Sequence, residues 1–168
     1  MGNTLIYTGK VIQLLHKDVK LPNGFIAGLD IIKHPGAVLI VPFESRNKII
    51  MLKQFRPVLN QYIHELPAGT LKSREAPFSC AQRELIEETG YGARKMQRIG
   101  EIVPVPGYST EKIIIYKAEQ LIQKTRRVEE DEVIEHSVYS KRQIQRMFRD
   151  KKIIDAKTMC ALALCGWL

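Results

Sequence analysis

A predicted helix that carries three closely spaced carboxylates lies within residues 69–90. Residues 76–89 are rich in strong helix formers and a glycine follows them, which predicts a helix that ends at position 90. Glu84 and Glu88 are four residues apart and share one helical face, with Glu87 at its edge. Like charges at this spacing destabilise an isolated helix by about 0.2–0.5 kcal/mol a pair. The segment therefore favours a helix whose carboxylates face a cation.

Magnesium is the cation that suits this group of carboxylates. Mg²⁺ takes hard oxygen ligands and is usually held by a few carboxylates together with water and substrate phosphates. Arg83 is adjacent to the group and can fix a carboxylate with its planar guanidinium. Gly69 allows a tight backbone turn, which makes the carbonyl of Ala68 a further candidate ligand. The alternative interpretation is a solvated, glutamate-rich helix surface that binds no ion.

The rest of the chain predicts a mixed sheet with helices on both faces. Before the helix, apolar β-branched stretches alternate with turn signals, which predicts a meander of antiparallel strands. Three more strands are expected after it. The predicted strands are residues 11–19, 25–32, 37–43, 48–55, 96–103, 112–118 and 133–139.

Two helices are expected in the C-terminal region. Ser140 is a candidate N-cap, and the first helix would present Ile144, Met147 and Phe148 on its apolar face. Asp155 is a second candidate N-cap, for a helix with apolar positions at Met159, Leu162 and Ala163.

Length and composition predict one domain over residues 1–168, with an α/β (α+β) fold. No apolar run approaches the roughly 20 residues that span a bilayer, so we expect a cytoplasmic protein without a membrane partner. The three cysteines lack a Cys-x-x-Cys spacing, which favours reduced structural thiols. The net charge of +8 favours anionic partners such as phosphates or nucleic acid.

The segment 69–91 resembles the Nudix box. That pattern is Gly, five residues, Glu, seven residues, then Arg-Glu-apolar-any-Glu-Glu-any-Gly-apolar, and this chain departs from it only in the aromatic Tyr91. The resemblance implies an α/β/α sandwich with a mixed sheet and hydrolysis of a nucleoside diphosphate linked to another group. It also implies that Mg²⁺, with Mn²⁺ as a substitute, is bound by the carboxylates named above and the Ala68 carbonyl, braced by Arg83 with Glu75.

Further segments resemble the branch of the family that hydrolyses ADP-ribose and other nucleoside diphosphate sugars. They are 53–56, 65–69 and the loop 106–111. The resemblance implies cleavage of ADP-ribose to AMP and ribose 5-phosphate. Arg56 would clamp the diphosphate, and Glu65, Gly107 and Glu111 would contact the substrate. Taken alone, the Pro-Gly pair of the loop is equally typical of a turn between strands.

An acidic run at 129–135 resembles the late loop that supplies the general base in this branch. The resemblance implies Glu130 as the proton acceptor and Glu132 as a further acidic group near the metals. Some members use a glutamate at the position of Glu111, so the order of candidates is Glu130, Glu132, Glu111. A solvated acidic loop is the alternative.

The resemblance further implies a homodimer in which N-terminal strands, within residues 1–36, complete the partner's pocket, beside a catalytic core at 37–168. Two other functions stay open. One is a nucleotide-sensing module that has lost its chemistry, and the other is hydrolysis of RNA 5′ ends, which the positive charge would suit. Basic and aromatic residues do not alternate along the chain, which argues against nucleic acid.

Overall fold

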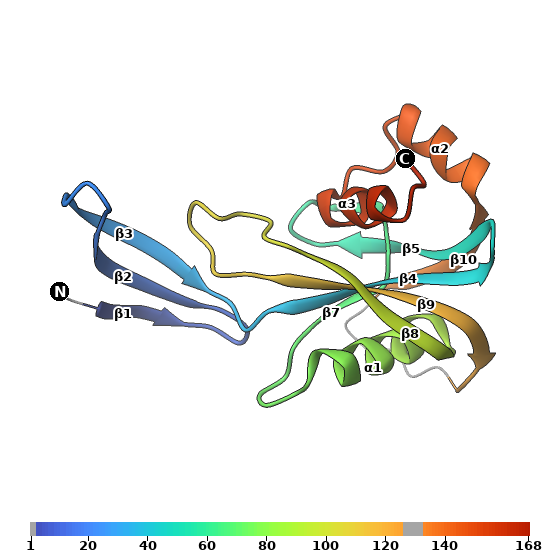
Figure 1. Cartoon of the computed structure of the whole chain (residues 1–168), viewed down its shortest axis with the longest axis horizontal. Helices are drawn as coiled ribbons and strands as arrows, with labels where there is room; N and C mark the ends of the chain where they lie inside the picture. The colour runs from blue at the N-terminus through green and yellow to red at the C-terminus, as the bar shows by residue number, and fades with distance from the viewer. Residues whose placement is uncertain (1–2, 126–132) are drawn as a thin grey trace.

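A computed structural model describes residues 3–125 and 133–168. These residues form two sheets and three helices (Figure 1). No helix in the described part of the chain is long and apolar enough to cross a membrane. The strands are β1 (Asn3–Thr8), β2 (Gln13–Lys20), β3 (Ile26–Lys33), β4 (Ala37–Ser45), β5 (Lys48–Arg56), β6 (Gln61–Glu65), β7 (Ala68–Thr70), β8 (Tyr91–Ile102), β9 (Ile113–Gln123) and β10 (Ile134–Ser140), and the helices are α1 (Pro77–Thr89), α2 (Lys141–Arg149) and α3 (Ala156–Leu164).

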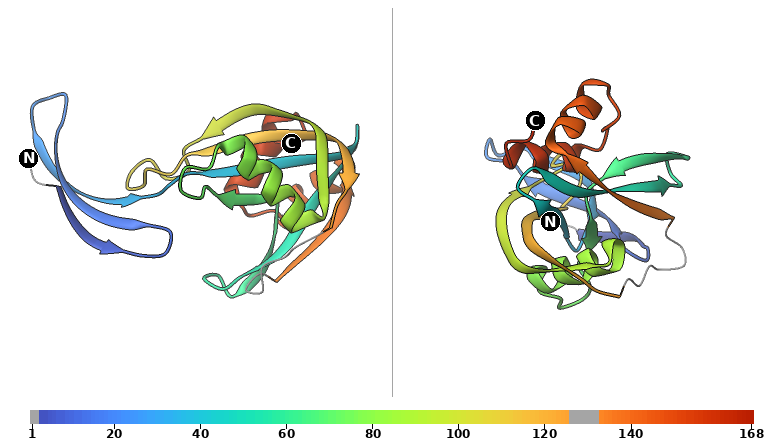
Figure 2. Two further views of the ribbon diagram at one scale, coloured as in Figure 1. Left: turned by 90° about the horizontal axis from the view of Figure 1, so that it is seen from below. Right: turned by 90° about the vertical axis from the view of Figure 1, so that its right-hand side faces the viewer.

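The larger sheet is mixed and lies between helices, as the sequence predicted. Its strand order is β10-β5-β4-β9-β8, while β6 pairs with β5 and β7 pairs with β4. The β4–β9 pair is parallel and the other pairs are antiparallel. Helix α1 lies on one side of this sheet and α2 and α3 lie on the other (Figures 1 and 2).

Strand β4 explains why the sheet needs cover on both faces. Its residues from Ala37 to Phe43 are all buried. Leu39 and Val41 belong to the apolar cluster that includes residues of α2 and α3, whereas Val38 and Ile40 belong to the cluster under α1. Burying one such side chain is worth about 1.5–3 kcal/mol, so the two clusters fix the sheet between its helices.

The N-terminal strands form a separate three-stranded antiparallel sheet, β1-β2-β3. The predicted continuous meander is therefore wrong at one point, because β3 and β4 belong to different sheets. The break falls at 34–36, where Pro35 lacks a backbone N–H and Gly36 adopts a positive φ of 100°. The small sheet extends away from the body of the molecule (Figure 1).

The helix boundaries match the predicted caps, while some apolar positions do not. Gly90 ends α1 with φ 74°, Ser140 forms a capping box with Gln143, and Asp155 caps α3. Phe148 and Ala163 are exposed rather than inward, because Met147 and Ala161 occupy the faces toward the core. Both exposed residues lie on the sides of short helices that face away from the sheet.

Short strands were missed and long ones underestimated. β1, β6 and β7 were not predicted, since β7 has three residues and β6 mixes polar and aromatic side chains. β8 and β9 extend beyond their predicted ranges and pair along their whole length as one long antiparallel ribbon. The lengths of β8 and β9 are set by their pairing with each other, and this pairing cannot be read from the sequence.

Candidate active site

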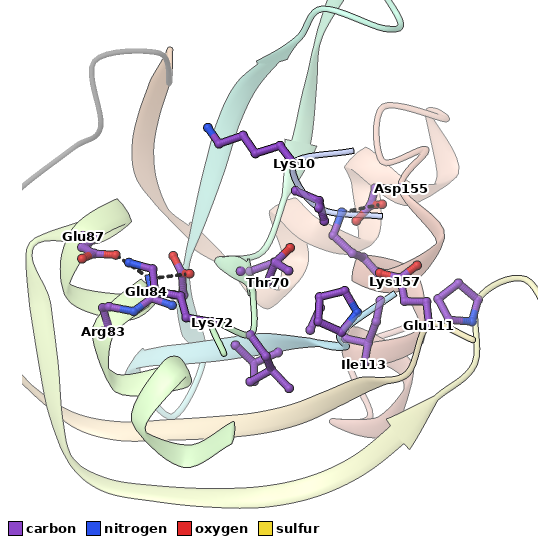
Figure 3. A pocket seen from close by; sticks show the side chains of 18 of the residues that line it. Lys10, Thr70, Lys72, Arg83, Glu84, Glu87, Glu111, Ile113, Asp155 and Lys157 are labelled. Atoms are coloured by element: carbon purple, nitrogen blue, oxygen red, sulfur yellow. Dashed lines mark hydrogen bonds and ion pairs between the residues drawn. The ribbon is translucent and has the colours of Figure 1, made fainter. Parts of the chain in front are cut away.

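A cleft of about 1120 Å³ lies between the C-terminal half of α1, the loop before that helix and the start of α3 (Figure 3). Glu84 and Glu87 lie at one side, and Lys157, Asp155 and Glu111 lie at the other. The further lining residues are Lys10, Val11, Pro35, Ala37, Val38, Arg56, Ala68, Gly69, Thr70, Leu71, Lys72, Ser73, Arg83, Pro104, Ile113 and Ala156. The cleft thus joins residues that are more than one hundred positions apart.

Gly69 allows Glu84 to approach the backbone of β7. A Cβ atom built on Gly69 would lie 1.8 Å from Oε1 of Glu84 and 1.9 Å from its Cδ. The predicted reason for this glycine, a tight turn, is wrong, because Gly69 lies in a strand and is not among the described glycines with positive φ. Glycine is required at this position because any side chain would overlap the Glu84 carboxylate.

Arg83 connects three of the box carboxylates. Its Nε and Nη2 donate to the two oxygens of Glu75, at 2.8 and 2.9 Å. Its Nη1 donates to Oε1 of Glu84 at 2.6 Å and to Oε2 of Glu87 at 2.8 Å. These hydrogen bonds hold the pKa of Glu75 down at about 2 and raise the pKa of Arg83 above its usual value. The arginine therefore remains charged and sets the orientation of all three carboxylates.

Glu88 is buried and faces β7. Its exposed fraction is 3%, and its Oε2 accepts a hydrogen bond of 2.9 Å from the backbone N–H of Ala68. The structure thus joins Ala68 and Glu88 directly, through the amide of Ala68. The thiol of Cys80, which contacts Arg83, is also buried, which raises its pKa to about 12 and fits a structural cysteine.

The box side chains suit a divalent cation in donor chemistry. Carboxylate oxygens of Glu84 and Glu87 converge on one nitrogen of Arg83, and hard oxygens of this kind are what Mg²⁺ binds. In the part of the chain that the structure describes, no group of three or more His, Cys, Asp or Glu side chains is arranged to hold a metal ion. In this geometry the guanidinium of Arg83 supplies the positive charge, so an incoming cation would compete with Nη1 for Glu84 and Glu87.

A second charged cluster lies across the cleft. The carboxylate of Glu65, 1% exposed, accepts from Nε of Arg56 at 2.7 Å and from Nη2 at 3.0 Å. The amine of Lys157 also binds Glu65, and it donates to Oδ1 of Asp155 at 2.9 Å. Since both oxygens of Glu65 are engaged, this carboxylate orients Arg56 and Lys157 in the structure.

Lys157 and Asp155 were not singled out from the sequence as site residues. Asp155 was identified only as a helix cap, a role that it has through the backbone N–H of Thr158. Lys157 follows two residues later and reaches the cleft because it pairs with a glutamate 92 positions earlier in the chain. The available signal was local, namely a lysine in the first turn of a capped helix, where the helix dipole disfavours a cation.

The predicted loop residues are placed in different ways. Glu111 lines the cleft, where its side chain is 25% exposed. Gly107 lies in the same loop but is not among the residues that line the cleft in the described structure. Glu130 and Glu132 lie outside the described residues, so their predicted roles are neither supported nor opposed.

The fold is a mixed sheet between helices, and the glutamates of α1 lie beside the short strand β7, which contains Gly69. A solved structure described as an ADP compounds hydrolase shares this fold, with a TM-score of 0.84 and 20% sequence identity over 99% of this chain and 90% of that chain. The model of the NUDIX domain matches residues 33–162. The chain belongs to the Nudix family, and it is a Nudix pyrophosphatase, a hydrolase.

Two relatives align over most of the chain. An ADP-ribose pyrophosphatase of Bacillus subtilis (strain 168) is 40% identical over 94% of this chain and 86% of its own length. A methanol dehydrogenase activator of Bacillus methanolicus is 36% identical over the same shares of the two chains.

Proposed function

We propose that the chain hydrolyses the diphosphate bond of ADP-ribose, with AMP and ribose 5-phosphate as products and Mg²⁺ as cofactor. The observation that carries the proposal is a cleft with an acidic cluster on one side and oriented cations on the other. Such a cleft suits a diphosphate bridged to metal ions, because metal cations held by the carboxylates and the side-chain cations opposite both bind phosphate oxygens. The 40% identity with an ADP-ribose pyrophosphatase supports the same substrate.

Glu84, Glu87, Glu88 and the carbonyl of Ala68 are the proposed Mg²⁺ ligands. When bound, Mg²⁺ neutralises phosphate charge and lowers the pKa of a water molecule that it coordinates. Arg83, held by Glu75, orients Glu84 and Glu87 in the structure, and a bound Mg²⁺ would take the place of its Nη1 at these two carboxylates.

Arg56 is the proposed clamp on the diphosphate, and Glu65 holds it in place. Glu111 and Gly107 are proposed to contact the substrate from the loop between β8 and β9. A loop glutamate then accepts the proton of the attacking water, and the anhydride bond to the leaving group breaks in line. Glu130 is the first candidate for this base, followed by Glu132 and Glu111.

A substrate panel tests the proposal. Phosphatase-coupled release of phosphate is measured with ADP-ribose, GDP-mannose, UDP-glucose, diadenosine polyphosphate and triphosphorylated RNA, each with Mg²⁺ and with Mn²⁺. We expect the highest kcat/KM for ADP-ribose. Turnover of RNA alone would point to a 5′-end hydrolase, and turnover of no compound would point to a sensing module. Calorimetric titration with Mg²⁺ reports separately on the proposed metal site.

A second candidate function is activation of a dehydrogenase, because a relative of 36% identity carries that name. Adding the chain to a methanol dehydrogenase assay tests this function. The comparison with a Glu88→Gln variant shows whether any activation requires hydrolysis. Activation by the wild type alone would make it a consequence of the pyrophosphatase, and equal activation by both would make it independent.

We also propose that the N-terminal sheet pairs two copies of the chain. Leu5, Ile6, Tyr7, Phe25 and Ile26 are each more than half exposed, and no residue of β1, β2 or β3 is buried. A second copy would cover this apolar surface. Size-exclusion chromatography with light scattering should give twice the sequence mass of 19.2 kDa.

A charged substitution tests the surface. Ile6→Glu should shift the chain toward monomer, while Val58→Glu should leave the mass unchanged, because Val58 is 98% exposed at the turn between β5 and β6. A wild-type monomer would contradict the proposed pairing.

A further inference from the structure

The segment 32–37 binds the loop that carries Glu111. Ile32 donates its N–H to the carbonyl of Tyr108 at 2.7 Å and accepts from the N–H of Thr110 at 3.0 Å. The N–H of Ala37 donates to the carbonyl of Lys112 at 2.9 Å. The chain that leaves the N-terminal sheet therefore runs beside the loop between β8 and β9, as both ribbon views show (Figures 1 and 2).

Thr110 closes this contact with its side chain. Its Oγ1 accepts from the backbone N–H of His34 at 3.0 Å and donates to the carbonyl of His34 at 3.4 Å. Glu111 is the next residue, so the hydroxyl of Thr110 limits where the Glu111 backbone can lie. The carboxylate then projects into the cleft opposite Glu84 and Glu87 (Figure 3).

The imidazole of His34 makes two different contacts. Its Nδ1 accepts from the N–H of Gly36 at 3.0 Å, which assigns the proton of the neutral ring to Nε2. Nε2 lies 3.9 Å from Oε1 of Glu111, beyond hydrogen-bond length but within the range of a charge–dipole attraction. The His34 side chain is only 12% exposed, so water screens this attraction poorly.

We infer that His34 and Thr110 are positioning residues for Glu111, and that through them the segment 32–37 sets the geometry of one wall of the cleft. His34 touches no reacting atom in this inference. Its N–H dipole and the Thr110 hydroxyl hold the Glu111 carboxylate in the place where it meets substrate. The inference rests on the proposed function, in which Glu111 acts on the nucleotide sugar.

His34→Asn separates the two contacts of the ring. The Oδ1 atom of asparagine takes the place of Nδ1 and still accepts from Gly36, whereas nothing replaces Nε2. We expect His34→Asn to lower kcat/KM for ADP-ribose on the order of tenfold, the size of a coupling between neighbouring residues. In a Glu111→Gln background the same substitution should change kcat/KM by less than about twofold.

Equal losses in the two backgrounds would overturn the inference, since His34 would then act without Glu111. So would wild-type kinetics of His34→Asn, or of Glu111→Gln. These results leave the proposed hydrolysis of ADP-ribose intact if the wild type performs it, and wild-type kinetics of Glu111→Gln would remove only the role proposed for Glu111.

Amide hydrogen exchange gives a readout that needs no turnover. Thr110→Val removes the hydroxyl and should raise exchange at residues 108–112, while Thr110→Ser keeps the hydroxyl and should match the wild type. Unchanged exchange in Thr110→Val would overturn the positioning role even in a chain that failed to hydrolyse ADP-ribose.

Discussion

Two charged clusters face each other across the cleft, and their compositions differ. On the α1 side, Arg83 is bound by the carboxylates of Glu75, Glu84 and Glu87. On the α3 side, Arg56 and Lys157 share the buried carboxylate of Glu65, and Asp155 binds Lys157 as well. The first cluster has one cation for three carboxylates, whereas the second has as many cations as carboxylates.

A balanced cluster and an unbalanced one serve different purposes. Carboxylates in excess repel one another, so the α1 side gains from further positive charge. The α3 side needs no further charge, and its carboxylates orient cations toward the cleft. We therefore expect substitutions on the α1 side to affect metal-dependent turnover, and those on the α3 side to affect substrate binding.

The largest effect is expected from Glu88→Gln. Glutamine can still accept from the N–H of Ala68, so the fold should be retained while the charge is lost. We expect kcat to fall on the order of 10²-fold or more, as when a strong electrostatic contact to the reacting groups is removed. Steady-state kinetics at saturating Mg²⁺ measures it, with the exposed Glu44→Gln as a control. Near-native turnover of Glu88→Gln would make the metal assignment wrong.

Gly69→Ala should disturb the α1 cluster without removing any charge. The new methyl group would overlap the Glu84 carboxylate and force it away from β7. We expect apparent affinity for Mg²⁺ to fall about 10–100-fold, the range found when the orientation of a metal ligand is disturbed. Gly92→Ala is the matched control, because its Cβ would make only ordinary contacts of 3.4 Å or more. Equal behaviour of the two variants would contradict the role given to Gly69.

Glu65→Gln tests the cluster on the α3 side. It leaves Arg56 and Lys157 without their shared anion, so we expect KM for ADP-ribose to rise on the order of tenfold with a smaller change in kcat. Unfolding free energy should fall by about 1.5–3 kcal/mol. This is less than the ~3–5 kcal/mol of a fully buried pair, because Arg56 is 39% exposed and partly screened.

Asp155→Asn is the matched control for Glu65→Gln. Asparagine caps a helix as well as aspartate does, so α3 should remain intact while Lys157 loses one partner. Its effect on KM should be smaller than that of Glu65→Gln. A larger effect would mean that Asp155, rather than Glu65, orients the cations.

The two clusters also differ in how far sequence could predict them. The α1 cluster is local, since Glu75, Arg83 and Glu84 lie within ten residues, and helical spacing brings the carboxylates together. The contact between Glu65 and Lys157 spans 92 residues and depends on how α3 packs against the sheet. No periodicity in the sequence encodes that distance.

Other features of the fold also divide into local ones, which the sequence predicts, and long-range ones, which it does not. The caps at Ser140 and Asp155 were predictable, because a cap needs only the next three residues. The two separate sheets and the exposure of Phe148 were not predictable. Both depend on how the strands and helices pack together in the fold. The reason for Gly69 was likewise wrong, since a close approach is visible only when Glu84 has been placed.

The smallest effect is expected at His64, next to Glu65 on β6. Burial lowers the pKa of His64, and the nearby Lys53 and Lys152 lower it further. Its Nδ1 is buried and has no hydrogen-bond partner among the described residues. The folded state therefore binds a proton less readily than the unfolded state, whose pKa is about 6.5.

Stability should accordingly fall as pH drops below 6.5, until the lowered folded pKa is reached. Urea unfolding at pH 7.5 and 5.5 measures this loss, which His64→Gln should reduce. His16→Gln provides a control of opposite sign, since a hydrogen bond to Asp30 raises the pKa of His16 and favours its charged form in the fold. Because His64 does not line the cleft, His64→Gln should leave KM unchanged. A raised KM would show that the α3 cluster depends on packing beyond its own four residues.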